Sequence, residues 1–322
     1  MMLRKRALFI GISLIIFILT PIILNADVQS GCSSSKESTE EKTSCVTVPR
    51  SIVFCGDTID LTRYDRHEHM DRELLAFSYM HSTSLQTIKR ANRYFPMVEP
   101  ILKEHGIPED FKYLMAIESG ANPFARSHAG AAGLWQIMPT TGKQLGLVVN
   151  NSVDERYHVE KSTHAACKYL KEAYERFGDW VSVAASYNAG QGRISQQQKS
   201  QYTDETLDLR LVEETARYVY RIFAVKMLFN NPRDFGFYLK AADLYPIIPC
   251  RTIKVSRDIS DLARFAKSQG TTYALLRDMN PWLRNSSLSC HGRTYTLLIP
   301  DNEGMYYNPR MVIPHDRRWV IN

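Results

Sequence analysis

The sequence predicts a mainly α-helical protein that ends in a small β-α-α-β module. Helical periodicity runs from about residue 60 to residue 245, and the breaks in it fall at Gly, Asn and Pro. Runs that alternate apolar and polar residues are scarce in this range. After Pro249 the pattern changes to strand, helix, helix, strand. We therefore expect an all-α domain at residues 60–246, followed by the β-α-α-β module at residues 250–300.

Residues 1–26 have the composition of a signal or membrane anchor. The basic stretch RKR at residues 4–6 precedes residues 7–24, which carry no charge and have about the minimum length for a membrane span. Basic residues in that place keep the N-terminus in the cytoplasm and send the rest of the chain across the membrane. Cys32, in SGCSSS, resembles the lipid-attachment cysteine of a bacterial lipoprotein. We expect an exported, membrane-anchored envelope protein, with a cleaved signal, an uncleaved anchor and lipid on Cys32 as open alternatives.

Two segments lack the periodicity of helices or strands. Residues 25–50 are rich in Ser, Thr, Glu and Lys, and we expect residues 27–59 to form a linker between membrane and domain. Residues 301–322 form a tail for which the pattern predicts no structure.

The net charge of the chain limits the classes of molecule that it is expected to bind. The formal net charge of +6 includes the three basic residues of the N-terminal flank, so the remainder is mildly basic. Such a surface suits an anionic envelope polymer or is simply a generic soluble surface, and it is too weak and scattered to indicate nucleic acid. No Cys/His grouping has zinc spacing, and we expect His67 and His69 on the surface, with no metal and no cofactor.

The chain has six cysteines, which is consistent with an oxidising compartment. Cys45 and Cys55 lie close together in the sequence, and Cys250 and Cys290 bracket the β-α-α-β module; both pairs are candidate disulfides. Cys167, in HAACKYLKEAYERF, is expected to be a small buried residue of a helix.

Glu118 is the most unusual residue of the predicted helical domain. With Phe111, Leu114 and Met115 it follows the i, i+3, i+4, i+7 spacing of one helix face, and Ser119-Gly120 then ends the helix. A carboxyl group desolvated against apolar side chains has a raised pKa and can donate a proton near neutral pH. The alternative is a glutamate at a frayed helix end that reaches into solvent.

Two polar-aromatic clusters follow Glu118. The glycine-rich GAAGLWQIMPTTGKQLG contains Trp135, whose flat face suits a sugar ring, and Gln136, which is both donor and acceptor. SYNAGQG contains Tyr187 and Asn188 at the end of a helix. The alternatives are a glycine-rich turn around a core tryptophan, and a helix terminus with Tyr187 in the core.

Four motifs in this order resemble the catalytic signature of the lytic transglycosylases, the lysozyme-like enzymes that cleave bacterial peptidoglycan. The motifs are Glu118-Ser119, GLWQ at 133–136, ASYNAG at 185–190, and Glu214-Thr215 with Tyr218-Val219. The resemblance covers about residues 60–300 and is greatest to the membrane-bound murein transglycosylase D type. It implies a lysozyme-like all-α catalytic domain that acts on peptidoglycan glycan strands.

The resemblance also implies residue roles. Glu118 matches the single catalytic acid and base of that family. The residues expected to contact the substrate are Ser119, Trp135, Gln136, Tyr187, Asn188 and Tyr218. The chain departs from the family pattern at Trp135, Ser186 and Val212, where methionine, alanine and proline are common. None of these departures removes a group that transfers a proton, so we expect activity.

The number of carboxylates determines the chemistry that the resemblance implies. Ordinary glycosidases use two carboxylates in the active site. Glu109, Asp110, Asp154 and Glu155 are expected in solvent-facing turns, so none of these four is expected to act as the second carboxylate. One carboxyl suffices if the C6 hydroxyl of MurNAc closes onto C1, which leaves a 1,6-anhydro end. The alternatives are a goose-lysozyme-like hydrolase and a non-catalytic wall-binding scaffold.

The C-terminal module resembles a LysM domain, which holds glycans that contain N-acetylglucosamine. The resemblance rests on ISDLARFAKSQG, LLRDMNPWL and YTLLIP. The usual Gly-Asp-Thr after the first strand is replaced by Ser256-Arg257-Asp258. A small cap packed on the catalytic domain is the alternative to a glycan-binding module.

Overall fold

The computed structural model describes residues 45–321, and its mainly helical architecture confirms the predicted fold class. The expected membrane segment and Cys32 lie outside the described residues. Within residues 45–321, no helix is both long enough and apolar enough to cross a membrane. The helices of the first part are α1 (Tyr64–Tyr79), α2 (His81–Glu104), α3 (Phe111–Ser119), α4 (Pro139–Gln144), α5 (Val159–Phe177), α6 (Trp180–Ala189), α7 (Gln191–Gln201) and α8 (Glu213–Asn230).

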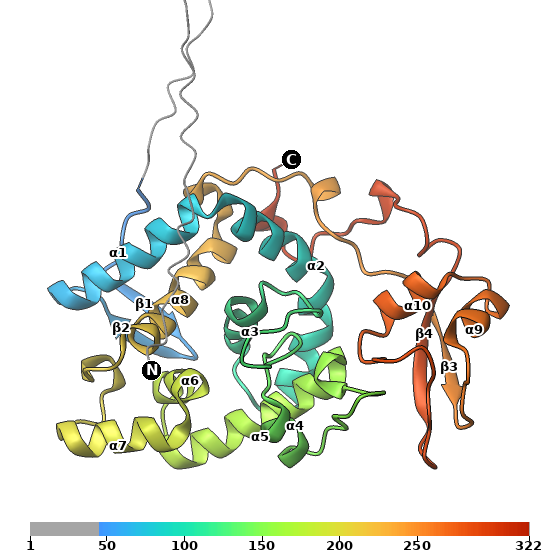
Figure 1. The fold of residues 1–322 in the computed structure, drawn as a ribbon. Helices are drawn as coiled ribbons and strands as arrows, with labels where there is room; N and C mark the ends of the chain where they lie inside the picture. The colour runs from blue at the N-terminus through green and yellow to red at the C-terminus, as the bar shows by residue number, and fades with distance from the viewer. Residues whose placement is uncertain (1–44, 322) are drawn as a thin grey trace, which may run out of the picture. The chain divides into compact units, whose positions relative to one another are not determined.

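Helix α3 lies between α2 and α8 in the middle of the helical part (Figure 1). Phe111, Leu114 and Met115 are fully buried, as their spacing predicts. Burying each of these side chains contributes roughly 1.5–3 kcal/mol, so this short helix is held in place by packing rather than by its own length. Gly120 ends the helix with a φ of 60°, a left-handed conformation that suits glycine. Glu118 is therefore anchored in the last turn of a rigid element.

The last part of the expected linker is an ordered hairpin, so the prediction for residues 51–59 is wrong. Strands β1 (Ser51–Phe54) and β2 (Asp57–Asp60) pair antiparallel. The Phe54 ring is buried against Phe111 and Phe223, with centroid separations of 6.0 and 5.3 Å. The alternation of buried and exposed residues in SIVF is too short to be distinguished from a linker by composition.

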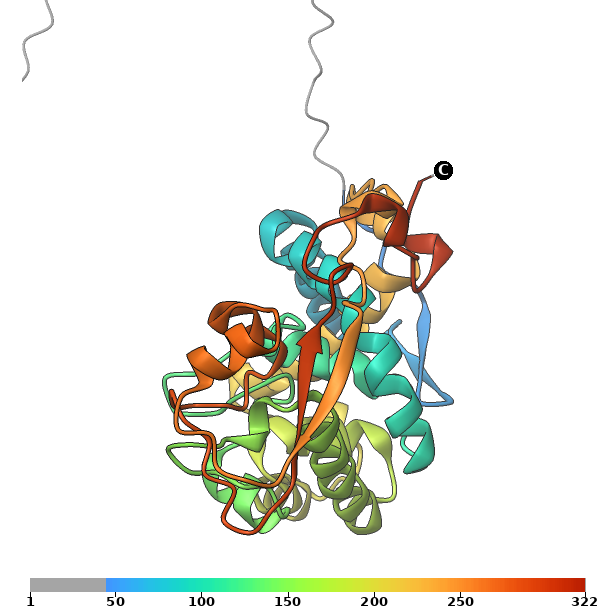
Figure 2. The ribbon, with the colours of Figure 1, turned by 90° about the vertical axis from the view of Figure 1, so that its right-hand side faces the viewer.

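The C-terminal module has the predicted β-α-α-β order: β3 (Cys250–Val255), α9 (Leu262–Ser268), α10 (Tyr273–Met279) and β4 (Tyr295–Pro300). Figure 2 shows β3 and β4 side by side, and they pair antiparallel from Cys250 opposite Pro300 to Val255 opposite Tyr295. Asn280 is fully buried, and its amide exchanges hydrogen bonds with the backbone of Leu298. This amide ties the end of α10 to β4.

The module joins the helical part through backbone contacts as well as side chains. The Asp154 N–H donates to the Trp282 carbonyl at 2.9 Å, and the Arg284 N–H donates to the Ser152 carbonyl at 2.8 Å. The Arg284 guanidinium lies 4.4 Å from the centroid of the Tyr157 ring. Backbone pairing of this kind fixes the register between the two segments.

The tail beyond β4 returns to the helical part. Trp319 is buried, with its ring centroid 5.9 Å from that of Phe95 and 5.0 Å from that of Phe229. The Ile321 N–H donates to the Leu239 carbonyl at 2.7 Å. Residues 312–321 therefore complete the core of the helical part, a role that the sequence pattern did not indicate.

The candidate disulfides are not formed, and Cys45, Cys55, Cys250 and Cys290 are free thiols. Cys250 begins β3, whereas the Cys290 sulfur lies 3.8 Å from the carbonyl oxygen of Val255, at the other end of this strand. Five strand residues span roughly 16 Å, well beyond the roughly 7 Å limit for Cα atoms of a disulfide. Cys55 lies in the hairpin turn, while the chain from Cys45 enters the hairpin at its opposite end.

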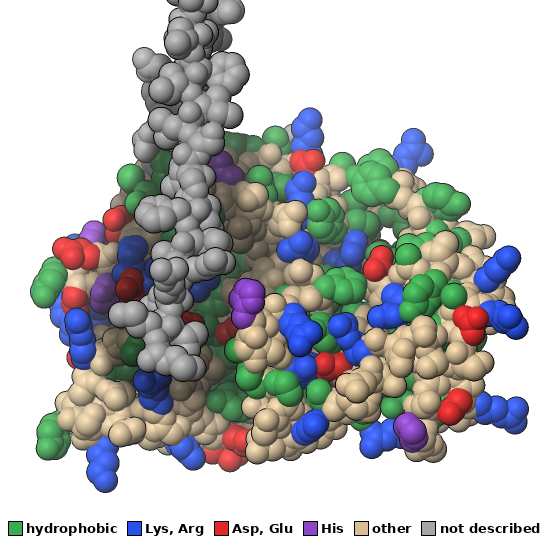
Figure 3. Space-filling view, in the orientation of Figure 1, with side chains coloured by type: hydrophobic (Ala, Val, Ile, Leu, Met, Phe, Trp, Pro, Cys, Tyr) green, Lys and Arg blue, Asp and Glu red, His purple; other side chains and the backbone are tan. Residues whose placement is uncertain are grey.

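Charged side chains are distributed over the face of the molecule seen in Figure 3, with Lys and Arg spread among apolar and polar neighbours. Many of the basic residues are paired with acids, as in Arg217–Glu73 and Lys226–Asp110. The second pair ties α8 to the residue before α3.

Candidate active site

Glu118 and Tyr218 form the centre of the candidate site. Glu118 projects from the last turn of α3, and Tyr218 projects from α8 with its side chain almost fully buried. The Tyr218 hydroxyl donates a hydrogen bond to the Glu118 carboxylate. Two residues separated by a hundred positions in the sequence thus meet because α3 packs on α8.

The electrostatic environment of Glu118 favours its protonated form. Burial is the main cause, and it raises the pKa of Glu118 to about 7, although the hydrogen bond from Tyr218 and the charge of Arg221 act in the opposite direction. The charge of Glu214, in the first turn of α8, adds to the rise. A carboxyl group with this pKa can donate a proton and accept it back near neutral pH.

Trp135 does not offer a face to a sugar, and this prediction is wrong. Its side chain is fully buried, and its indole N–H donates to the Thr163 hydroxyl on α5 at 2.9 Å. Its carbonyl accepts a hydrogen bond of 2.7 Å from the Tyr187 hydroxyl. Trp135 is therefore the core tryptophan of a glycine-rich turn, and it supports Tyr187 through its backbone.

Two further predicted residues, Gln136 and Ser119, have side-chain donors that are already engaged by backbone carbonyls. Gln136 has a φ of 45° and donates its amide to the carbonyls of Ala125 and Gly133. The Ser119 hydroxyl donates to the Met115 carbonyl at 3.2 Å. Gln136 and Tyr187 both line a small cavity between α4, α5 and α6. The two residues are thus brought together although they are far apart in sequence.

Asn188 is positioned by the start of α8. Its side-chain oxygen accepts a hydrogen bond of 2.9 Å from the Thr215 hydroxyl. The Glu214-Thr215 motif therefore has two separate effects: Thr215 fixes Asn188, and Glu214 raises the pKa of Glu118.

An ion pair between a buried glutamate of α1 and a partly exposed arginine of α8 joins these two helices, and the sequence did not reveal it. Glu73 is almost fully buried and accepts hydrogen bonds from Arg217, at 2.7 Å for the shorter one. Arg217 directly precedes Tyr218, so this pair fixes the helix turn that carries the hydroxyl bound to Glu118. A glutamate on α1 with no motif around it gives no signal of this role.

The other acidic residues are not all in solvent-facing turns, and the prediction is wrong for Asp154 and Glu155. Both are buried: Asp154 pairs with Arg156 at 2.7 Å, and Glu155 pairs with Lys161. Asp110 is largely buried and pairs with Lys226, whereas Glu109 is exposed. Each of these carboxylates has a cationic partner, which distinguishes it from Glu118.

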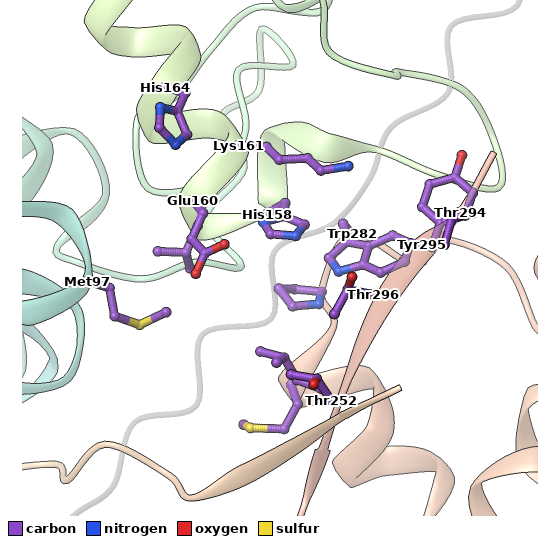
Figure 4. Close-up of a pocket in the computed structure, with 14 residues that line it drawn as sticks. Met97, His158, Glu160, Lys161, His164, Thr252, Trp282, Thr294, Tyr295 and Thr296 are labelled. Carbon is purple, nitrogen blue, oxygen red and sulfur yellow. The ribbon is translucent and has the colours of Figure 1, made fainter. Parts of the chain in front are cut away.

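A separate cavity of about 460 Å³ lies where α5 meets the C-terminal module (Figure 4). Trp282 stacks on Tyr295 there, with centroids 5.3 Å apart, and His158 lies next to the same indole. None of the residues predicted to bind substrate lines this cavity.

Comparison with known proteins agrees with the two-part architecture. Residues 97–209 match the family model described as "Transglycosylase SLT domain", and residues 251–303 match "Soluble lytic transglycosylase C-terminal LysM-like domain". Both matches agree with the family resemblance that the motifs indicated.

Among individual relatives, "Membrane-bound lytic murein transglycosylase D" of Escherichia coli K12 is 29% identical over 253 residues, which are 76% of this chain and 54% of the relative. "Soluble lytic murein transglycosylase" of the same organism is 37% identical over 90 residues, which are 26% of this chain and 14% of the relative. The crystal structure of the 70 kDa soluble lytic transglycosylase from E. coli has a TM-score of 0.39, with 22% identity over 52% of this chain and 28% of that chain. The chain spans about half the length of the first of these relatives.

Proposed function

We propose that this chain is a lytic transglycosylase that cleaves the MurNAc-β-1,4-GlcNAc bond of peptidoglycan and leaves 1,6-anhydro-MurNAc ends. The observation that carries the proposal is a glutamate with a pKa of about 7 that accepts a hydrogen bond from Tyr218, within a domain that matches the SLT model. No cofactor is required for this reaction.

In the first step, the protonated Glu118 gives its proton to the glycosidic oxygen as the bond from MurNAc C1 to that oxygen breaks. The N-acetyl group of MurNAc stabilises the positive charge at C1. In the second step, the ionised Glu118 removes the proton of the C6 hydroxyl while O6 bonds to C1. The proton returns to Glu118 and no water is consumed. A pKa near the working pH suits a group that acts first as an acid and then as a base.

Substrate contacts are proposed for Ser119, Gln136, Tyr187 and Asn188, with Tyr218 as the residue that holds the carboxyl. Several of their polar atoms are engaged in internal hydrogen bonds. We propose that Gln136 uses its side-chain oxygen, and Asn188 its side-chain N–H groups, to contact the N-acetyl and hydroxyl groups of the glycan.

A hydrolase is the alternative that a specific observation favours. Glu214 is exposed and close enough to affect the pKa of Glu118, so it is the candidate for a second carboxylate that activates water. The products distinguish the two reactions, because a hydrolase leaves a reducing MurNAc end.

The test is mass spectrometry of the muropeptides that the chain releases from purified sacculi, with Glu118→Gln and Glu214→Gln as paired variants. We expect products one water lighter than those of lysozyme, lost in Glu118→Gln and retained in Glu214→Gln. Reducing ends, lost in both variants, would indicate the hydrolase. No release by the wild-type chain would favour the non-catalytic scaffold.

We also propose an envelope location, with the helical domain on the extracytoplasmic side and the module at residues 251–303 contacting glycan. The relative named as membrane-bound and the uncharged residues 7–24 support the location. Binding of sacculi by Glu118→Gln, compared with the same variant carrying substitutions in the module, tests the glycan contact.

A further inference from the structure

Three metal-ligating side chains converge where the end of α2 meets α5. Glu104 is the last residue of α2, His105 is its C-cap, and His164 lies on α5. One ligand atom from each of these residues lies within 4.8 Å of the others. We propose that Glu104, His105 and His164 form a binding site for a divalent transition metal, of which Zn²⁺ fits best.

The donor set selects the kind of ion. Two imidazole nitrogens and one carboxylate oxygen are ligands that zinc binds in tetrahedral sites, with water in the fourth position. Calcium and magnesium prefer oxygen ligands in larger number, which this group does not offer. The two histidines are partly exposed and Glu104 is exposed, so an ion can enter from solvent without opening the core.

The distance between the rings is close to what such an ion needs. His105 Nε2 and His164 Nδ1 are 2.8 Å apart, and the ring planes are inclined by 65°. Two nitrogens on a tetrahedral zinc ion lie about 3.3 Å apart if each Zn–N bond is about 2.0–2.1 Å. The rings would thus separate by about 0.5 Å as the ion replaces the proton that they share.

Some of the charges near Glu104, His105 and His164 favour the binding of a cation, and others oppose it. The C-terminus of a 24-residue helix carries partial negative charge, and Glu104 adds a full one. Lys103 lies in the same turn, and Lys168 and Lys171 act on His105 from α5. Because these lysines oppose a cation, we expect affinity in the micromolar range rather than that of a buried structural zinc site.

A bound ion would strengthen the support of the candidate active site. His164 follows Thr163, whose hydroxyl accepts the hydrogen bond from the Trp135 indole, and the Trp135 carbonyl in turn accepts one from Tyr187. A metal that joins α2 to α5 here fixes the helix that holds Trp135. The expected consequence is a metal-dependent rise in thermal stability.

The test is calorimetric titration of the full chain, in mild detergent and with a reductant, using Zn²⁺ alone. The test variants are His105→Gln and His164→Gln, and His67→Gln is a matched control because His67 is an exposed histidine outside the group. We expect the wild type and the control to bind one more equivalent of Zn²⁺ than either test variant, or to bind it at least 10–100-fold more tightly. Their Tm should rise with Zn²⁺, while that of the test variants should not.

Cobalt supplies a second readout, because four-coordinate Co²⁺ absorbs visible light far more strongly than Co²⁺ in water. We expect this signal in the wild type and the control, and its loss in both test variants. Equal Zn²⁺ stoichiometry and affinity in all four proteins, or a Co²⁺ spectrum unchanged by the substitutions, would overturn the proposal. Unchanged circular dichroism shows that a variant is folded, so that a loss of binding reports on the site.

Discussion

Two partly buried glutamates on neighbouring helices differ in their proton affinity. Glu99 on α2 accepts hydrogen bonds of 2.8 Å from both Lys112 and His315, and Glu118 on α3 accepts one from the neutral Tyr218. Burial raises the pKa of both carboxyls, but for Glu99 the hydrogen bonds from His315 and Lys112 outweigh burial and the pKa is lowered. For Glu118 burial prevails, and the pKa rises to about 7.

Close cationic partners can therefore outweigh the effect of burial on the pKa of a carboxyl group, as Lys112 and His315 do for Glu99. Asp154 and Glu155 are also buried, and each is paired with a cation. An acid that must give up and recover a proton needs burial without a close cation. Of the carboxyls discussed, Glu118 is the one in that environment.

The largest expected effect follows from removing the titrating group itself. Glu118→Gln keeps the shape of the side chain and removes its proton chemistry, so we expect release of muropeptides to fall by at least about 10²–10⁴-fold. Glu99→Gln is the matched control, because Glu99 is also a partly buried glutamate but lies outside the candidate site, and it should retain activity. Comparable losses in both variants would show that the substitutions act through folding.

A smaller effect is expected when the partner of Glu118 is altered. Tyr218→Phe removes the hydrogen bond that lowers the pKa of Glu118, so that pKa should rise further. We expect the alkaline limb of the pH–rate profile to move to higher pH, with the maximal rate reduced about tenfold because the carboxyl is no longer held in position. An alkaline limb that stays in place would separate Tyr218 from the titration of Glu118.

The two glutamates should also differ in how they affect stability with pH. The folded-state pKa of Glu118 lies above its ordinary value of 4.5, so its contribution to stability is fully present below pH 4.5 and is lost as the pH rises through 7. Glu118→Gln should therefore be more stable than the wild type at pH 8, by on the order of 1–3 kcal/mol, and the gain should shrink toward pH 4. Urea unfolding at both pH values measures this difference; a variant less stable than the wild type at pH 8 would contradict it.

Glu99 should behave in the opposite way and by a smaller amount. Its pKa is lowered in the folded state, so its stabilising effect is present above its ordinary pKa and is lost as the pH falls through the lowered value. Glu99→Gln should cost about 1–2 kcal/mol at pH 7 and little at the acidic end of the range. The same urea series provides the measurement, and a loss that grows on acidification would rule out this interpretation.

The sequence predicted the helices and strands better than it predicted the tertiary contacts between them. The helix that carries Glu118 and the β-α-α-β order follow from periodicity and turn residues, which are local properties. The hairpin at residues 51–60 was missed because strands of four residues carry too little pattern, and because their burial depends on Phe111 and Phe223. The tail was missed for the same reason: Trp319 is a core residue only in contact with α2 and α8.

Several residues of the candidate site could be predicted from the sequence, but their contacts and their burial could not. Glu118 was identified by a charge on an apolar helix face, but the burial of Trp135 depends on Thr163 from another helix. The burial of Asp154 and Glu155 beside Arg156 and Lys161 was not visible in the sequence pattern either. The cluster of Glu104, His105 and His164 depends on contact between His105 and His164, which are 59 positions apart, and no local spacing reveals such a contact.

Helix α8 receives both ends of the described chain, with the N-terminal hairpin packed on Phe223 and the tail packed on Phe229. The packing around the helix that presents Tyr218 to Glu118 is therefore complete only when residues 51–60 and residues 312–321 have both folded against it. Contacts between such distant segments slow folding, because the chain closes its largest loop before they form. A nascent chain that lacks its last residues would hold an incomplete core, so the proton-transfer site would be assembled at the end of folding rather than at its beginning.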